Sequence, residues 1–394
     1  MKHVKKLAVV LILVCLMGVA VSPTAAEPTS GFRVLASTAG ADFPIRLNFS
    51  LIAAGDAEIS DIRLQYRVER TSFTLVTSEA MAEFEPGTQV QASYTLDMRR
   101  VGGLPPGTAV QYWWLVTDAR GRLITTEPGR VTWDDARYSW RSLSEGQLTV
   151  YWYQGSESFA RQLMAAAQAA LPRLSQEGGT LLTEPVAIYI YNGSRDLQGA
   201  MIFPNEWTGG VAYPDYSTIT LGVSPVNLNW GIRTIAHELA HLVVHRLTYN
   251  PYLDVPVWLD EGMAMYAEGP LDGQFLSALD QAVVADRLFS VRSLASPFSA
   301  FTDQSVLSYA QSYSIVEFLI SRYGQARLLE LLGVFRQGSD YDDALERVYG
   351  FDMDGLNQLW RDYVRRQYLP PAVWQPEAAL ASTAVDFELS GAGR

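Results

Sequence analysis

Three residues spaced along one short segment could do chemistry together. His237 and His241 are four residues apart, so on a helix they lie on one face about one turn apart, where two imidazoles can hold one divalent metal ion. Glu238 lies about 100° further round such a helix, where its carboxylate can reach a water on that ion without binding the ion itself. Zinc lowers the pKa of a bound water towards ~7, and the carboxylate takes its proton as the hydroxide attacks a carbonyl carbon. The spacing therefore predicts zinc-dependent hydrolysis.

The helix that carries these residues is expected to be buried, because most of its other positions between 234 and 243 are apolar. Two imidazoles in such a helix need polar partners, and a metal ion supplies one to both at once. The alternative is two core histidines bonded to backbone carbonyls, with Glu238 paired to a cation. The chain has no lysine after Lys6, and the nearest arginines are Arg233 and Arg246, which makes the alternative harder to satisfy.

Catalytic zinc takes a third protein ligand and keeps one position open. His245 lies roughly 12 Å along the helix axis from His237, so we expect it to be structural or to support a ligand. Glu261, twenty residues after His241, lies in an apolar segment where a buried carboxylate needs a cation, and it is the candidate third ligand. Asp260 fits either an acid at the N-terminal end of its helix or an acceptor for the ring N–H of a ligand histidine.

Two segments resemble the gluzincin branch of zinc metallopeptidases, in particular the peptidase MA-like family. They are His237-Glu238-x-x-His241 and Trp258-Leu259-Asp260-Glu261-Gly262-x-Ala264. The resemblance covers residues 137–369 and implies that His237, His241 and Glu261 bind one zinc ion per chain, with Glu238 as the general base. Zinc aminopeptidases share a similar second segment, but this chain lacks their Gly-Ala-Met-Glu-Asn motif and its ligand spacing is one residue longer.

The resemblance also implies supporting parts. Tyr309 and Tyr313 lie in a segment similar to a helix that follows the metal site in that family, and either is a candidate to stabilise the oxyanion. The strand predicted at 217–221 precedes the metal helix and is the candidate edge that pairs with an extended substrate. An ordinary edge strand is an equally good interpretation of this segment.

The first 26 residues are expected to be a secretory signal. Lys2, Lys5 and Lys6 precede an apolar run at 7–21 and a group of small residues that ends at Ala26. The run is shorter than the ~20 residues that a membrane span needs, so we expect cleavage rather than a retained anchor, with no stable membrane insertion afterwards. The only cysteine, Cys15, would leave with the signal, which excludes a disulfide or a Cys-bound metal from the mature chain.

The remaining chain is expected to be multi-domain. Residues 31–133 show period-two patterns such as Leu47, Phe49 and Leu51, and the segment 104–114 resembles immunoglobulin-like or fibronectin type III modules, which predicts an all-β sandwich. Residues 137–369 are expected to form an α+β zincin-like metallopeptidase domain that is mostly helical from residue 229 onward. Residues 370–394 are expected to be a disordered tail.

These features predict a secreted or extracytoplasmic zinc metallopeptidase that hydrolyses a protein or peptide substrate by Glu-assisted attack of zinc-bound water. After cleavage, 27 arginines would face 42 acidic residues, and this net charge of −15 argues against a nucleic-acid partner. The alternative is a non-catalytic cell-envelope or surface binding protein on an inactive peptidase scaffold, which would have no need to keep all four site residues. Hydrolysis of a non-peptide amide or ester is left open.

Overall fold

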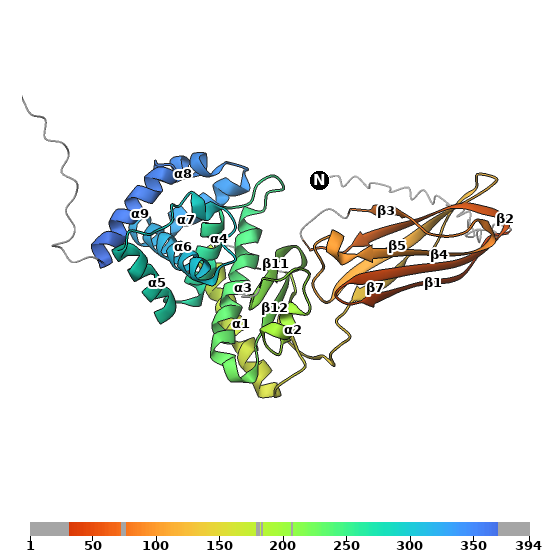
Figure 1. Cartoon of the computed structure of the whole chain (residues 1–394), viewed down its shortest axis with the longest axis horizontal. Helices are drawn as coiled ribbons and strands as arrows, with labels where there is room; N and C mark the ends of the chain where they lie inside the picture. The colour runs from red at the N-terminus through yellow and green to blue at the C-terminus, as the bar shows by residue number, and fades with distance from the viewer. Residues whose placement is uncertain (1–30, 72–75, 179–181, 183, 206–207, 369–394) are drawn as a thin grey trace, which may run out of the picture.

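The chain folds into a β-rich N-terminal region followed by a mixed region in which helices predominate (Figure 1). The computed structural model describes residues 31–368, except 72–75, 179–181, 183 and 206–207. The predicted signal at 1–26 and the predicted tail at 370–394 lie outside the described residues. Among the described residues, no helix combines the length and the apolar character that a membrane crossing requires.

The N-terminal region is one hydrogen-bonded sheet of seven strands. These are β1 (Arg33–Asp42), β2 (Arg46–Val68), β3 (Ser78–Met81), β4 (Gly87–Asp97), β5 (Thr108–Asp118), β6 (Leu123–Thr125) and β7 (Gly129–Trp133). The long strand β2 belongs to both halves of the sheet, because its first part pairs with β1 and β4 and its second part with β5 and β3. The predicted alternation is confirmed, since Leu47, Phe49 and Leu51 are buried in one core. The assignment of this region to an immunoglobulin-like sandwich stays a prediction.

A second sheet begins after the N-terminal region and has the strand order β11-β12-β10-β9-β8. Its strands are β8 (Arg141–Glu145), β9 (Leu148–Trp152), β10 (Val186–Tyr191), β11 (Gly210–Tyr213) and β12 (Thr218–Gly222). Strands β9, β10 and β12 are parallel, and the outer strands β8 and β11 run antiparallel to them.

The structure corrects the predicted edge strand. The segment 217–221 falls on β12, which lies between β11 and β10 and is buried along its whole length. The edge is β11, a strand of four residues that folds back on β12 through the short turn η2 (Pro214–Tyr216). A strand bonded on both sides and covered on both faces cannot receive a substrate, so β12 is not the predicted edge and β11 takes its place as the candidate.

The prediction that the chain is mostly helical from residue 229 onward is confirmed. They are α1 (Glu157–Gly178), α2 (Ser194–Gln198), α3 (Leu228–Thr248), α4 (Val257–Glu268), α5 (Gly273–Val284), α6 (Thr302–Tyr323), α7 (Gln325–Arg336), α8 (Tyr341–Tyr349) and α9 (Met353–Tyr368). Helices α1 and α3 share one apolar core with the second sheet, and α4 to α9 share another. Figure 1 shows α3 between the second sheet and the C-terminal helices, so its two sides meet different cores.

Helices α4 and α6 pack closely together at Gly262. A Cβ at this position would lie 2.8 Å from the carbonyl carbon of Ser312 and 2.7 Å from a methyl group of Val316. Only glycine lets the two backbones pack at this distance. The contact sets the position of α4, and with it the position of the residue before Gly262, which is Glu261.

We expect Gly262→Ala to lower the free energy of unfolding by about 1–3 kcal/mol, because α4 must move away from α6 to admit the methyl group. Urea denaturation measures the change. Gly333→Ala is the matched control, since nothing lies within 4 Å of a Cβ there and Gly333 is inside helix α7. This control should be stabilised by about 0.5–1 kcal/mol. Equal effects of the two substitutions would contradict the packing account.

Candidate metal site

Helix α3 presents both predicted histidines towards α4. Its buried apolar residues, which include Ile235, Leu239 and Leu242, pack into the core of the second sheet and α1. His237 and His241 lie on the opposite side of the helix, with ring centroids 4.9 Å apart and only 12% and 14% of their side chains exposed. The packing of Ile235, Leu239 and Leu242 against the second sheet therefore turns the two imidazoles away from that sheet.

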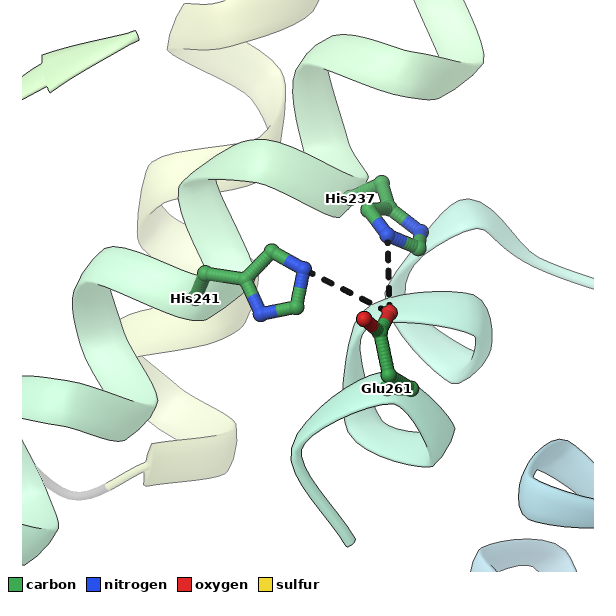
Figure 2. Close-up of side chains that lie close together, drawn as sticks. All are labelled: His237, His241 and Glu261. Atoms are coloured by element: carbon green, nitrogen blue, oxygen red, sulfur yellow. Dashed lines mark ion pairs between the residues drawn. The ribbon is translucent and has the colours of Figure 1, made fainter. Parts of the chain in front are cut away.

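Helix α4 brings Glu261 to both rings (Figure 2). Its Oε2 atom lies 3.4 Å from Nε2 of His237 and 3.6 Å from Nε2 of His241. These three side chains each direct one ligand atom into a group whose members lie within 4.8 Å of one another. The predicted ligand set is thus brought together by two helices.

The geometry and chemistry of these atoms fit a zinc ion. Tetrahedral zinc with bonds of about 2.0–2.1 Å places neighbouring ligand atoms about 3.3–3.4 Å apart, close to the separations from Oε2. The same Oε2 atom of Glu261 is buried and has no hydrogen-bond partner. A buried carboxylate oxygen without a donor is costly, and a cation at this point would satisfy it.

A carboxylate holds the other nitrogen of each ring. Nδ1 of His237 lies 2.8 Å from Oε1 of Glu268, and Nδ1 of His241 lies 3.0 Å from Oδ2 of Asp260. When each Nδ1–H donates to its carboxylate, each Nε2 keeps a lone pair directed at the position that Glu261 also faces. Asp260 fits both of its predicted roles, since it lies in the first turn of α4 and its carboxylate faces a ring nitrogen of His241.

Glu268 was not predicted from the sequence. It lies seven residues after Glu261, which is nearly two turns along α4 and on the same face of that helix. This spacing is a signal that could have identified it. Arg233 lies on the outer side of this carboxylate, with its Nη2 atom 3.4 Å from Oε2 of Glu268.

The carboxylates around the two imidazoles make positive charge favourable at this site. Burial lowers the pKa of His241, but the carboxylates of Asp260 and Glu261 outweigh it and raise that pKa to about 9. Burial also opposes protonation of His237, yet Glu261 and Glu268 raise its pKa well above the usual value. Without a metal ion, protons on the imidazoles would balance these acids. A divalent cation would replace them.

Glu238 lies on the side of α3 that faces the edge strand β11. It is buried, and burial raises the pKa of its carboxyl group. A Cβ at Gly210, the first residue of β11, would lie 3.0 Å from the carboxyl carbon of Glu238. Glycine at position 210 therefore lets the backbone of the edge strand approach the predicted general base.

The two candidate tyrosines are placed differently. The ring centroid of Tyr309 lies 6.4 Å from that of His237, and burial, together with Glu261 and Glu238, raises the pKa of its hydroxyl well above the usual value. The hydroxyl of Tyr313 lies 3.5 Å from Oε1 of Glu317, and its ring lies against Tyr266. Tyr309 is therefore the better placed of the two to donate a hydrogen bond at the site.

His245 lies outside the ligand group, as its spacing indicated. Its Nε2 atom lies 3.3 Å from Oδ1 of Asp215, on the turn η2 between β11 and β12. A cavity of about 260 Å³ is lined by His245, His241 and Asp260 and by the loop that follows α3. This cavity lies on the Asp260 side of His241.

Comparison with known proteins identifies one family. Residues 166–366 match the model of the Peptidase MA superfamily. No curated protein matches the chain.

Similar solved structures include two of OgpA from Akkermansia muciniphila. The catalytically inactive form in complex with an O-glycopeptide (glycodrosocin) substrate is 10% identical, with a TM-score of 0.20 over 26% of this chain and 28% of that chain. Wild-type OgpA is 11% identical, with a TM-score of 0.21 over 29% of this chain and 31% of that chain. This chain therefore spans less than a third of the length of each.

We expect Glu268→Ala to weaken zinc binding by about 10- to 100-fold, because His237 loses the partner that fixes its ring and its tautomer. Competition with a chelator of known affinity measures the change. Glu330→Ala, which removes a half-exposed carboxylate paired with Arg327, is the control and should bind zinc like the wild type. Zinc affinity that is unchanged in Glu268→Ala would show that this carboxylate does not support the ligand.

Proposed function

This chain belongs to the Peptidase MA superfamily, and on that premise we propose that it is a zinc-dependent metallopeptidase of the gluzincin type. One observation supports the proposal most directly. A single buried oxygen of Glu261 lies within 3.6 Å of the Nε2 atoms of two histidines, and a carboxylate holds the other nitrogen of each ring. In this proposal His237, His241 and Glu261 hold the metal ion.

Zinc bound by these residues would supply a Lewis acid that polarises the substrate carbonyl and makes water more acidic. The carboxylate of Glu238 would accept a proton from the attacking water and pass it to the departing amine nitrogen. Burial raises the pKa of Glu238, which makes its carboxylate a stronger base for this task. The new C–O bond would form first, and the scissile C–N bond would break as its nitrogen takes the proton.

Two further parts of the chain would serve the substrate. The hydroxyl of Tyr309 would donate a hydrogen bond to the carbonyl oxygen as negative charge develops on it. The free edge of β11 would pair with an extended peptide by β-augmentation, since Gly210 lies beside the general base. An extended protein or peptide chain is therefore the proposed class of substrate.

The proposal also covers the cellular setting. Residues 1–26 would direct the protein out of the cytoplasm as a cleaved signal, and the mature enzyme would act as a secreted or cell-envelope protein. Residues 31–133 would form an immunoglobulin-like or fibronectin type III-like module beside the peptidase.

We expect the wild-type protein to contain about one zinc ion per chain and to hydrolyse a casein-type substrate. His237→Ala should lose the zinc, because it removes one of the three ligands. Glu238→Gln should keep the zinc and lose about 10³-fold or more in hydrolysis, because the amide cannot accept the proton. Metal analysis and a proteolysis assay measure the two effects.

His245→Ala is the matched control for these variants, since it removes a histidine of the same helix that lies outside the ligand group. It should keep both zinc and activity. A wild-type protein that binds no zinc, or a fully active Glu238→Gln variant, would overturn the proposal and leave a non-catalytic binding protein as the conclusion.

We expect Tyr309→Phe to lower kcat by about 10²-fold with unchanged zinc content, because the substitution removes only the donor to the developing oxyanion. Tyr313→Phe changes the same chemical group one turn along α6 and should have little effect. Equal losses in the two variants, measured by steady-state kinetics, would show that Tyr309 has no special role.

A further inference from the structure

Trp230 stands out on α3 because its indole is 41% exposed, whereas most of the large apolar side chains of this helix are buried. It lies seven residues before His237, which is nearly two helical turns, so both side chains lie on the same face of α3. The two residues are separated by about 10 Å along the helix axis. An exposed aromatic surface thus lies on the same face as the metal ligands.

The indole of Trp230 packs over the start of the edge strand. A Cβ at Gly209 would lie 2.7 Å and 2.8 Å from the Cη2 and Cζ2 atoms of the ring. Gly209 accepts a hydrogen bond from the N–H of Gly222, so it continues the pairing of β11 with β12 by one residue. The next residue, Gly210, is the one that contacts Glu238. Because neither glycine has a side chain, the indole can lie against Gly209 and the carboxyl group of Glu238 against Gly210.

We infer that Trp230 forms a substrate subsite that selects an apolar side chain, aliphatic or aromatic, within three residues of the scissile bond. The inference rests on the proposed peptidase function. A peptide paired with β11 would pass Gly210 beside Glu238 and Gly209 beside Trp230. A residue in an extended chain advances about 3.3 Å, so the indole lies within reach of a side chain close to the reaction centre.

The chemistry of the neighbouring residues favours an apolar occupant over a cationic one. Indole rings attract both kinds of side chain. Arg233 follows Trp230 at the i+3 position, where side chains on a helix are neighbours, and its guanidinium is about one third exposed. Arg233 and His237 already pair with Glu268, so this carboxylate has less to offer a further cation, whereas an apolar side chain would gain by covering the indole.

The test is substrate profiling of the zinc-loaded full-length protein with a peptide library. Wild type should enrich Leu, Ile, Met or Phe at one position within three residues of the cleaved bond. Trp230→Ala should lose this enrichment, and its kcat/KM for a peptide with Leu at that position should fall roughly 10- to 100-fold. A matched peptide with Gly at that position should be cleaved at nearly the wild-type rate.

Three further variants make the test specific. Trp230→Phe should retain the preference, and Trp230→Gln, which keeps a long side chain without the ring, should lose it. Tyr252→Ala removes an aromatic ring that is 87% exposed beyond the other end of α3 and should retain the preference. All variants should bind zinc like the wild type, which shows that the site is intact.

An unchanged profile in Trp230→Ala and Trp230→Gln would overturn the inference, as would a wild-type preference for Lys or Arg at every enriched position. A wild-type protein that binds zinc but cleaves no peptide would instead overturn the proposed function. The two failures are therefore distinguishable.

Discussion

The structure depends on one electrostatic constraint, which is that buried and partly buried carboxylates surround two imidazoles. Glu261 faces both rings, Asp260 and Glu268 each hold one ring nitrogen, and Glu238 is buried next to His237 in the sequence. The chain has no lysine after Lys6, and Arg233 pairs with Glu268 on the outer side of the cluster. Several negative charges held partly or fully out of water around two neutral rings would be strongly unfavourable. A bound cation would make the arrangement stable, and in the proposed function the same cation would supply its reactivity.

The backbone distances that create this cluster depend on glycines. Gly262 lets α4 pack against α6, which fixes Glu261 relative to the histidines of α3. Gly210 lets the edge strand approach the other side of α3 at Glu238. A methyl group on either glycine would prevent the contact. The backbone therefore comes close to neighbouring groups at two positions around the site. The glycines at these positions set the size of the site, and the charged residues set its chemistry.

Features that depend on local sequence patterns could be predicted, whereas features that depend on long-range pairing could not. The face shared by His237 and His241 follows from the periodicity of a helix, and the helical region predicted from residue 229 onward agrees with the start of α3 at Leu228. The edge strand could not be predicted in this way, because β11 has four residues and its pairing depends on the turn η2. The position of Glu268 could be predicted in part. Its spacing from Glu261 places it on the same face of α4, but the spacing does not show which imidazole it contacts. The choice of Tyr309 over Tyr313 depends on how α6 packs, which is a tertiary property.

The N-terminal region carries no residues with recognisable chemistry, yet it contacts the part of the fold that positions the edge strand. The N–H of Thr71 donates to the carbonyl oxygen of Asp215 at 2.7 Å, within the turn η2 between β11 and β12. The side chain of the same Asp215 lies 3.3 Å from His245 of α3. The segment that follows β2 thus holds the turn through the backbone of Asp215, and His245 of α3 faces the side chain of the same residue. Since β11 begins four residues before this turn, the contact restrains the strand that lies beside Glu238 and Trp230. The N-terminal region therefore affects the site by restraining β11, the edge strand of the second sheet. This contact could not be predicted from the sequence of the N-terminal region.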